Sequence, residues 1–443
     1  MDKLVPIHEL DSGWKPSRDS DGDVQSTLKS GDLSRLLTMK LGHRLRFNLL
    51  SLSPEIDGNE LPVHEYELLH VGLSEHGWNI GDKPARDALL YAARRNSYHP
   101  IREYLEHIET NPSIEEVDLE KISTYYLKTN DPLYDSMMAA TLIAAVSRVM
   151  DPGCKFDNCT VLKGPQGARK SSAWQALAGP EWFSDTPQDN DKDLRMLIQT
   201  CWIYELAELE SVTGKKEVGQ LKALLSSQID QFRAPYGSAM GRYPRQSILV
   251  ATVNPDSFLR DPTGSRRFWV IDLPHKSGEF IDTQKLCSDR DRIWKAAMLS
   301  YRSGRKPILQ AHEQLESDSR NSGFEEENIF LAPLAAWLAS DPPAPLSFTT
   351  HEAIASSSSR DRYNIKSQDA RMAAEALRQL GCVQDKCQSR RGGERVRLWH
   401  RPDSDDSGIS FLSESDFTPA GERDLGISSH VSDQIQKAIN FWK

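Results

Sequence analysis

CTVLKGPQGARKSS, residues 159–172, decides the fold of this chain. The run begins with apolar and β-branched residues, which predict a strand, and then passes through two glycines. The following residues, SSAWQALAG, predict a helix. Strand, glycine-rich loop and helix in this order form a supersecondary unit of α/β proteins. We therefore expect a parallel sheet covered by helices, with a phosphate-binding loop at this position.

The loop follows the pattern G-x-x-x-x-G-K-[ST], in which backbone N–H groups and a lysine surround the phosphates of a nucleotide. Gly164, Lys170 and Ser171 match the pattern, but Arg169 replaces its second glycine. A chance glycine turn is the alternative interpretation. The predicted nucleotide-binding residues are Gly164, Pro165, Gln166, Gly167, Ala168, Arg169, Lys170, Ser171 and Ser172.

Polar residues end two further apolar runs. Glu205 ends CWIYEL, with Glu208 one turn later, and Asn254 ends SILVATVN. A carboxylate there can complete the Mg2+ shell or orient the attacking water, and an amide can position that water. Spacing does not decide which glutamate has which role, and Asn254 is also an ordinary strand-ending residue. We expect Lys170, Glu205, Glu208 and Asn254 to be catalytic, and Ser171 and Glu205 to be ligands of Mg2+.

A pair of arginines, Arg266 and Arg267, precedes the apolar run FWVIDL. The pair can be a solvated turn. It can also reach a nucleotide bound to a neighbouring subunit, where an arginine stabilises the transition state of γ-phosphate transfer. This second interpretation makes both arginines catalytic and requires an oligomer.

Composition indicates a soluble globular chain, because 38% of the 443 residues are hydrophobic, 27% are charged and the net charge is −10. The first residues lack the apolar core of a secretory signal, and we expect no membrane segment. Six cysteines without zinc-ligand spacing predict reduced thiols. We therefore expect a cytoplasmic protein.

Length and periodicity divide the chain into several parts. Apolar residues within 87–108 and 135–150 recur at helical spacing, which predicts an all-helical N-terminal region. The predicted parts are a flexible segment at 1–33, a helical domain at 34–150, an α/β ATPase core at 151–305, a linker at 306–328, a winged-helix domain at 329–401, and an acidic linker with a short terminal helix at 402–443.

Three predicted helices and two predicted strands within 329–401 indicate the winged helix. Residues 360–401 hold 11 Lys/Arg against 5 Asp/Glu, and the excess lies on the third helix and the hairpin, the parts that contact duplex DNA in such domains. A winged helix can also dock a protein. The candidates for phosphate contacts are Arg371, Arg378, Arg390, Arg391 and Arg395.

Five stretches, in this order, resemble the virulence-associated protein E family: YHPIREYLE, SRVMDPGCKFDNCTVLKGPQG, WIYELAEL, LKALLSSQIDQFRAPYG and FLRDPTGSRRFWVI. This family consists of AAA+-type ATPases related to superfamily 3 helicases and carried mostly by phages and mobile elements. The resemblance implies that 164–171 is motif A, that Glu205 and Glu208 lie in motif B, and that Asn254 ends motif C.

The resemblance also implies that residues 221–245 form the hairpin that grips single-stranded DNA in the central channel of a hexameric ring. Cations and aromatic residues alternate there, as suits phosphate contacts and base stacking, although a basic surface loop has the same composition. The implied DNA-binding residues are Lys222, Arg233, Tyr236, Arg242 and Arg245. The sequence holds no acidic cluster for a primase site, so any primase would be a separate partner.

The sequence thus predicts an α/β P-loop NTPase core of the AAA+, superfamily 3 helicase-like type, with an all-helical N-terminal region and a C-terminal winged helix. The predicted function is that of an ATP- and Mg2+-dependent helicase or translocase. It would act as a homo-oligomer, of hexamer type, on single-stranded DNA and on duplex origin DNA in replication of a phage or mobile element. The alternative is a DNA-binding scaffold whose degenerate loop hydrolyses ATP weakly or not at all, which Arg169 favours.

Overall fold

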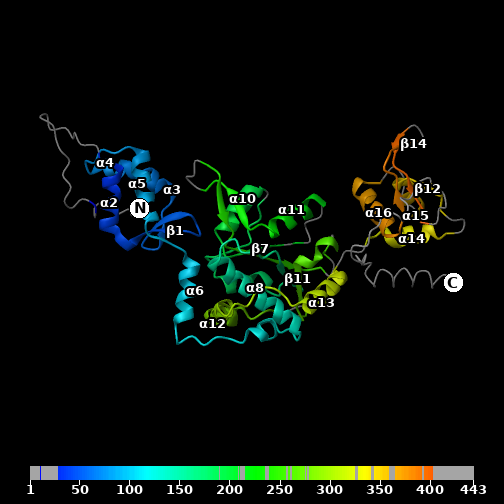
Figure 1. Ribbon diagram of the computed structural model, residues 1–443, viewed down its shortest axis with the longest axis horizontal. Coiled ribbons are helices and arrows are strands. Elements are labelled where there is room, and N and C mark those ends of the chain that lie inside the picture. Colours follow the sequence, from blue (N-terminus) through cyan, green and yellow to red (C-terminus); the bar gives the residue numbers. More distant parts are fainter. Residues whose placement is uncertain are drawn as a thin grey trace, which may run out of the picture. The chain divides into compact units, whose positions relative to one another are not determined.

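The computed structural model of the protein consists of two compact units, residues 1–326 and 327–443 (Figure 1). It describes residues 10, 28–188, 190–207, 209, 215–234, 239–255, 258–259, 262–274, 276, 279–324, 328–340, 344–358, 365–391 and 394–402. The acidic linker and terminal helix predicted for 402–443 lie outside these residues from 403 onward, as does most of the segment predicted to be flexible at 1–33.

The first unit begins with a mixed layer of helices and strands. Four short strands form a sheet in the order β3-β2-β1-β4: β1 (Leu45–Asn48), β2 (Ser53–Ile56), β3 (Asn59–Glu60) and β4 (Ser97–Tyr98). Four helices share an apolar cluster with this sheet: α2 (Ser30–Leu41), α3 (Val63–Glu67), α4 (Leu69–Glu75) and α5 (Asp82–Arg94). The prediction of an all-helical region is therefore wrong. The strands have at most 4 residues each, too few to carry a period-2 signal.

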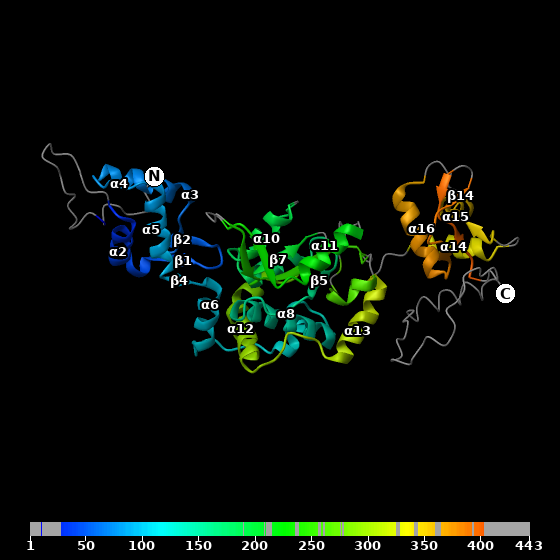
Figure 2. The same cartoon turned by 45° about the horizontal axis from the view of Figure 1, so that its top comes forward.

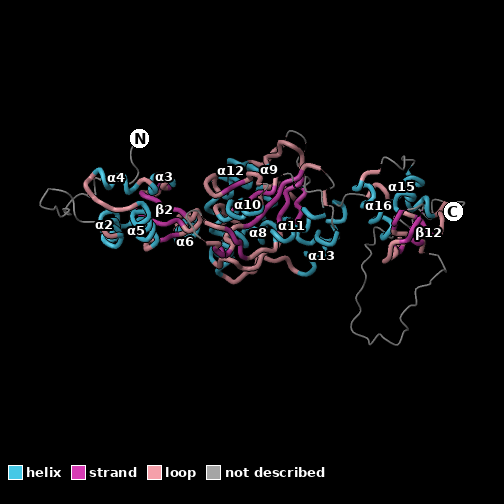
Figure 3. Tube along the Cα trace, turned by 90° about the horizontal axis from the view of Figure 1, so that it is seen from above, coloured by secondary structure: helices cyan, strands magenta, loops and turns pink. Residues whose placement is uncertain are grey.

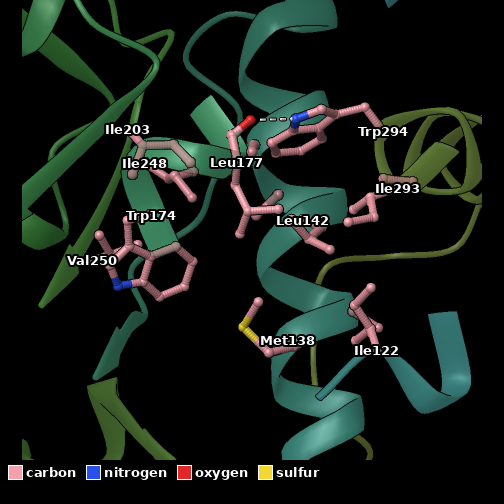
Figure 4. Close-up of a cluster of buried hydrophobic side chains, with 14 of the residues drawn as sticks. Ile122, Met138, Leu142, Trp174, Leu177, Ile203, Ile248, Val250, Ile293 and Trp294 are labelled. Atoms are coloured by element: carbon pink, nitrogen blue, oxygen red, sulfur yellow. Dashed lines mark hydrogen bonds between the residues drawn. The ribbon is translucent and has the colours of Figure 1, made fainter. Parts of the chain in front are cut away.

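A larger apolar cluster begins at α6 (Pro100–Thr110) and continues through α7 (Ile122–Tyr126), α8 (Pro132–Met150) and α12 (Thr283–Arg302). The boundary predicted at residue 150 cuts through this cluster. By length and apolarity α8 could cross a membrane, but 83% of its apolar window is buried inside the protein. Figure 4 shows α8 packed between the sheet residues Ile203 and Ile248 and the α12 residues Ile293 and Trp294. The helix therefore serves as a core element of the first unit.

Five parallel strands form the central sheet, in the order β11-β5-β10-β7-β6. They are β5 (Cys159–Lys163), β6 (Phe183–Ser184), β7 (Ile203–Leu206), β10 (Ile248–Val253) and β11 (Phe268–Asp272). Figure 2 labels two of them, β5 and β7. Alternate side chains enter opposite layers, as the pleat requires. Ile203 and Val250 join the cluster of α8 and α9 (Lys170–Ala178), whereas Tyr204 and Leu249 join the cluster of α10 (Asp191–Gln199) and α11 (Lys215–Leu225). The expected α/β fold with a parallel sheet is confirmed (Figure 3).

Strand order determines where a ligand can approach this sheet. The chain leaves β5 toward β6 on one side and later crosses to β11 on the other side of β5. Ligands of open α/β sheets bind beyond the carboxyl ends of the strands where the strand order reverses in this way. The loop that follows β5 lies at that edge.

The segment predicted as a linker, 306–328, contains a well-packed helix, α13 (Ala311–Asn321). Its Asn321 side chain is 1% exposed and donates hydrogen bonds to the carbonyls of Ser265 and Phe268. The linker prediction is therefore wrong. The sequence suggested a linker because α13 is polar on most sides, and its few buried positions give no apolar periodicity.

The described residues of the second unit form three helices, α14 (Leu331–Leu338), α15 (Thr350–Ser358) and α16 (Ser367–Gln379). Strands β12 (Ser347–Phe348), β13 (Val383–Gln384) and β16 (Trp399–His400) form one antiparallel sheet, and β14 (Ser389–Arg391) pairs with β15 (Glu394–Val396) in a hairpin. Trp399 and Phe348 lie in the apolar core of the unit. Thr349 and Glu352 exchange hydrogen bonds at the start of α15, which is a capping box.

Candidate functional site

The loop between β5 and α9, residues 164–169, is called the glycine loop below. Gly167 has φ +86° and Arg169 has φ 60° and ψ 37°, so both lie in the left-handed region. A non-glycine residue there costs about 1–2 kcal/mol. Arg169 thus adopts the backbone conformation that the expected glycine would supply. Its exposed guanidinium lies over the Phe280 ring, 3.8 Å from the centroid.

The segment after β11 fixes the glycine loop by a second contact. The Ile281 N–H donates to the Ala168 carbonyl at 3.1 Å. The Gly164 backbone packs so close to Leu273 that a Cβ there would come within 3.2 Å of the leucine Cβ. A side chain at Gly164 would therefore press against Leu273, the residue that follows β11.

Lys170 begins α9 and is buried, with 7% of its surface exposed. Its Nζ donates to the carbonyls of Gly164 and Pro165, at 2.8 and 2.9 Å, and to Asn254 Oδ1 at 2.9 Å. Asn254 directly follows β10, the strand beside β5. The structure therefore brings the predicted lysine and asparagine together, although they are far apart in the sequence.

Glu205 is 1% exposed on β7 and lies beside the start of α9. Its Oε1 accepts hydrogen bonds from Ser171 Oγ, at 2.7 Å, and from Thr252 Oγ1. Its Oε2 has no partner among the described residues. Burial raises the pKa of the Glu205 carboxyl above its ordinary value, and the two hydroxyl donors act in the opposite direction.

A divalent cation fits the chemistry of this pair. The Ser171 hydroxyl and the Glu205 carboxylate offer the hard oxygen ligands that Mg2+ prefers, and Glu205 Oε2 is a buried acceptor without a donor. No group of three or more His, Cys, Asp or Glu side chains that could hold a metal occurs within the described ranges. A cation at this position would therefore depend on oxygens of a bound phosphate chain, as Mg2+ commonly does.

The arginine pair lies at the amino ends of the parallel strands, opposite the end that carries the glycine loop. Arg266 and Arg267 immediately precede β11, whose first residue, Phe268, pairs with Cys159 at the start of β5. The glycine loop follows the last residue of β5. The 5 residues of β5 separate the amino end of the strand from its carboxyl end by roughly 16 Å, at about 3.3 Å per residue. Neither arginine can reach the glycine loop of its own chain.

The guanidinium groups of this pair make no ion pair with any side chain that the structure describes. Arg266 is exposed, and Arg267 is half-buried with its Nε lacking a partner in the described part of the chain. The carbonyl of Arg266, by contrast, accepts hydrogen bonds from Asn158 Nδ2 and Gln314 Nε2.

The predicted DNA-binding segment contains an antiparallel hairpin of β8 (Ile229–Phe232) and β9 (Gly241–Pro244). Arg233 and Arg242 are exposed there, Lys222 is half-buried on α11, and Tyr236 and Glu208 lie outside the described residues. The prediction for Arg245 is wrong. Its side chain is 0% exposed, and its Nε and Nη2 each donate a hydrogen bond to a carboxylate oxygen of the buried Asp230 at 2.7 Å. This arginine is therefore not available to DNA.

In the second unit, Arg371, Arg378, Arg390 and Arg395 are exposed. Arg391 also lies on β14, and its side chain is outside the described part. Arg390 is directly opposite Arg395 in the hairpin, while the Arg378 guanidinium lies 5.5 Å from the Trp399 ring centroid. Like charges directly opposite one another destabilise a strand pair, so this hairpin favours an anion between them.

Sequence reasoning missed three contributors to the site. Thr252 is a polar residue inside an otherwise apolar strand, which was a readable signal. The sequence around Phe280 and Gln314 gave no such signal, because their contacts are with segments that only the fold brings together.

Comparison with family models finds a match to part of the chain. Residues 108–326 match the model of the virulence-associated protein E-like domain. No curated protein sequence matches the chain.

Solved structures of the NrS-1 C terminal region resemble the chain at low identity. The A form apo structure of residues 305-718 is 12% identical, with a TM-score of 0.42, and the match covers 84% of this chain and 98% of that chain. Two further apo structures are each 11% identical, with TM-scores of 0.34 and 0.35, and cover 65% of this chain and 78% of those chains.

Proposed function

We propose that this chain, which carries a virulence-associated protein E-like domain at 108–326, is an ATPase that moves along DNA as a ring of identical subunits. One observation carries the proposal. Side chains from α9, β7 and the end of β10 meet beside the glycine loop, with Lys170 bound to Asn254 and Ser171 bound to Glu205. A lysine, a hydroxyl, a carboxylate and an amide at one edge of a parallel sheet are the groups that phosphoryl transfer requires.

The glycine loop acts as the P-loop in this proposal. Its backbone and the N-terminus of α9 bind the phosphates, and Lys170 exchanges the carbonyls of Gly164 and Pro165 for the terminal phosphates. Asn254 already lies within hydrogen-bond distance of the Lys170 ammonium, so its amide would stand beside the reacting phosphate and position the attacking water.

Ser171 and Glu205 would hold Mg2+, which supplies charge neutralisation at the phosphates when bound. The hydroxyls of Ser171 and Thr252 orient the Glu205 carboxylate. With Glu205 engaged in this way, Glu208, three positions further along the sequence, is the glutamate left to orient the attacking water.

The arginine pair supports an oligomer. Arg266 and Arg267 lie too far from the glycine loop to serve their own site, and neither guanidinium has an ion-pair partner in the described part of the chain. Presented to an adjacent subunit, such an arginine stabilises the charge that develops on the transferred phosphoryl group. A ring, of hexamer type, gives every site one neighbour of this kind.

Two surfaces support contact with DNA. The exposed Arg233 and Arg242 of the β8–β9 hairpin suit the backbone of a single strand. The order of elements in the second unit supports a winged helix, in which the opposed Arg390 and Arg395 would bind duplex phosphates. Together these features favour a role in the replication of a phage or other mobile element, in which any primase would be a separate partner.

The competing function is a scaffold that binds DNA without hydrolysing ATP, which the left-handed Arg169 favours. Phosphate release by wild type and by Lys170→Ala, each with and without single-stranded DNA, separates the two. An ATPase predicts Mg2+-dependent release that DNA stimulates and that Lys170→Ala reduces by at least about 100-fold. Equal release by the two proteins would leave only the scaffold.

A further inference from the structure

Side-chain amides hold the backbone around the arginine pair. Asn321 Nδ2 donates to the carbonyls of Ser265, at 2.8 Å, and Phe268, at 3.0 Å. Gln314 Nε2 donates to the carbonyl of Arg266 at 3.3 Å, and Gln314 Oε1 accepts from Trp269 Nε1 at 3.4 Å. The turn of Ser265 to Trp269 is therefore bound at both ends and in the middle by one helix, α13.

Helix α13 is in turn attached to the start of α8. Ser136 Oγ donates to Glu313 Oε1 at 2.6 Å, and Arg320 bonds Asp131, the N-cap residue of α8. Since α8 lies in the apolar core, the turn is connected through α13 to the most buried helix of the unit.

These contacts engage only the backbone of the turn and the indole of Trp269. They leave the guanidinium groups of Arg266 and Arg267 without an ion-pair partner in the described residues. This arrangement is expected of an arginine whose backbone is held in place while its guanidinium group remains available to another molecule. Catalytic groups have to be held within about 0.5 Å of their productive position by residues around them.

We propose that Gln314 and Asn321 are positioning residues that hold the Arg266–Arg267 turn in place for the active site of the adjacent subunit. The inference rests on the proposed function, because it requires ATP hydrolysis at a site shared by two copies of this chain. Gln314 acts through Arg266 and does not touch the nucleotide of its own chain.

Complementation between two defective chains tests this proposal. A Lys170→Ala chain has a defective nucleotide site but intact arginines, whereas an Arg267→Ala chain in which Arg266→Ala is also introduced, the double arginine variant, has an intact nucleotide site and offers no arginine. Mixed together, they form some interfaces that combine an intact site with an intact arginine, so activity should exceed that of either chain alone. Gln314→Ala should behave like the double arginine variant, since its own nucleotide site is unchanged.

We expect Gln314→Ala alone to lower kcat by about tenfold, as a misplaced catalytic group does, with little change in KM. Activity should recover when Lys170→Ala is added and should not recover when the double arginine variant is added. His312→Ala, an exposed neighbour on α13, is the matched control and should keep wild-type kcat. Asn321→Ala, assayed in the same mixtures with its folding checked by circular dichroism, provides the second variant.

The outcomes are distinct. Wild-type kcat for Gln314→Ala, or a loss that Lys170→Ala does not restore while it restores the double arginine variant, would overturn the positioning role and leave the proposed function standing. Failure of Lys170→Ala to restore the double arginine variant would remove the shared active site itself, and this inference with it.

Discussion

The Arg169 guanidinium stacks on the ring of Phe280, with 3.8 Å between the guanidinium carbon and the ring centroid. The contact joins the residue that departs from the phosphate-loop pattern to the segment that follows β11. It directs the arginine side chain toward Phe280 and gives the left-handed backbone of Arg169 a stabilising partner. At an exposed site such a stack contributes about 0.5–1 kcal/mol.

Replacing Arg169 with glycine should therefore preserve or improve nucleotide turnover, because glycine adopts the left-handed conformation without strain. Phe280→Ala should weaken nucleotide binding about two- to fivefold in the wild-type chain, by loss of the stack, and have little effect in the Arg169→Gly chain. Titration of a fluorescent ATP analogue against the four proteins measures the coupling. Equal effects of Phe280→Ala in both backgrounds would show that the stack does not act on the loop.

Glu205→Gln should abolish turnover and should stabilise the fold increasingly as pH rises. Burial raises the pKa of Glu205, so between the ordinary pKa of a glutamate, about 4.3, and the folded value, the folded protein retains a proton that the unfolded chain releases. Stability from this group is complete below that range and is lost as pH rises through it. Glutamine has no proton to lose, so its advantage over wild type should grow with pH and then level off.

Thermal melts of both proteins from pH 4.5 to 8 measure this difference. Burial lowers the pKa of His99 to about 4, which gives the opposite slope in part of the same range, but His99 is present in both proteins and cancels in the comparison. Phosphate release should fall at least about 100-fold in Glu205→Gln. A constant difference in Tm across this range would contradict the raised pKa.

Two arginines of the hairpin region should respond differently to removal. Arg245→Ala breaks a buried ion pair with Asp230 and should lower the free energy of unfolding of the first unit by about 3–5 kcal/mol. The loss should be smaller to the extent that Arg195, which also bonds Asp230, still neutralises its charge. Arg242→Ala should change stability by less than about 0.5 kcal/mol, because that side chain is exposed. It should instead lower the salt dependence of single-stranded DNA binding by about 0.7 in slope.

Urea unfolding and DNA titrations at several salt concentrations provide both measurements. A stable Arg245→Ala protein with weakened DNA binding would restore Arg245 to the DNA-binding set and contradict its burial.

Deletion of residues 327–443 should weaken duplex binding and leave basal ATP turnover unchanged, because this unit has its own core and the residues proposed for the nucleotide site all belong to the first unit. In the full chain, Arg390→Ala combined with Arg395→Ala should flatten the plot of log affinity against log salt by about two units, one for each phosphate contact. Lys83→Ala removes an exposed cation of the first unit and is the control. An unchanged slope would identify the second unit as a protein-docking module.

The sequence determined the central layer and the chemistry offered at its edge. Apolar runs of strand length became β5, β7 and β10, and Lys170, Ser171, Glu205 and Asn254 occupy the ends of elements as their spacing indicated. This worked because local propensity, a glycine turn and the parallel arrangement of strands all act over short stretches of chain.

Only the tertiary structure decided which polar residues are buried, which contact a neighbouring element and which remain exposed to solvent. Arg242 and Arg245 are three positions apart and equally basic, yet one is exposed and the other is enclosed with Asp230. The same holds for Gln314 and Asn321, polar residues of a segment that looked like a linker and that bind the turn before β11. Their hydrogen-bond partners lie 45 to 56 positions away in the sequence. The free energy of pairing a buried polar group exists only once the fold has removed water from it.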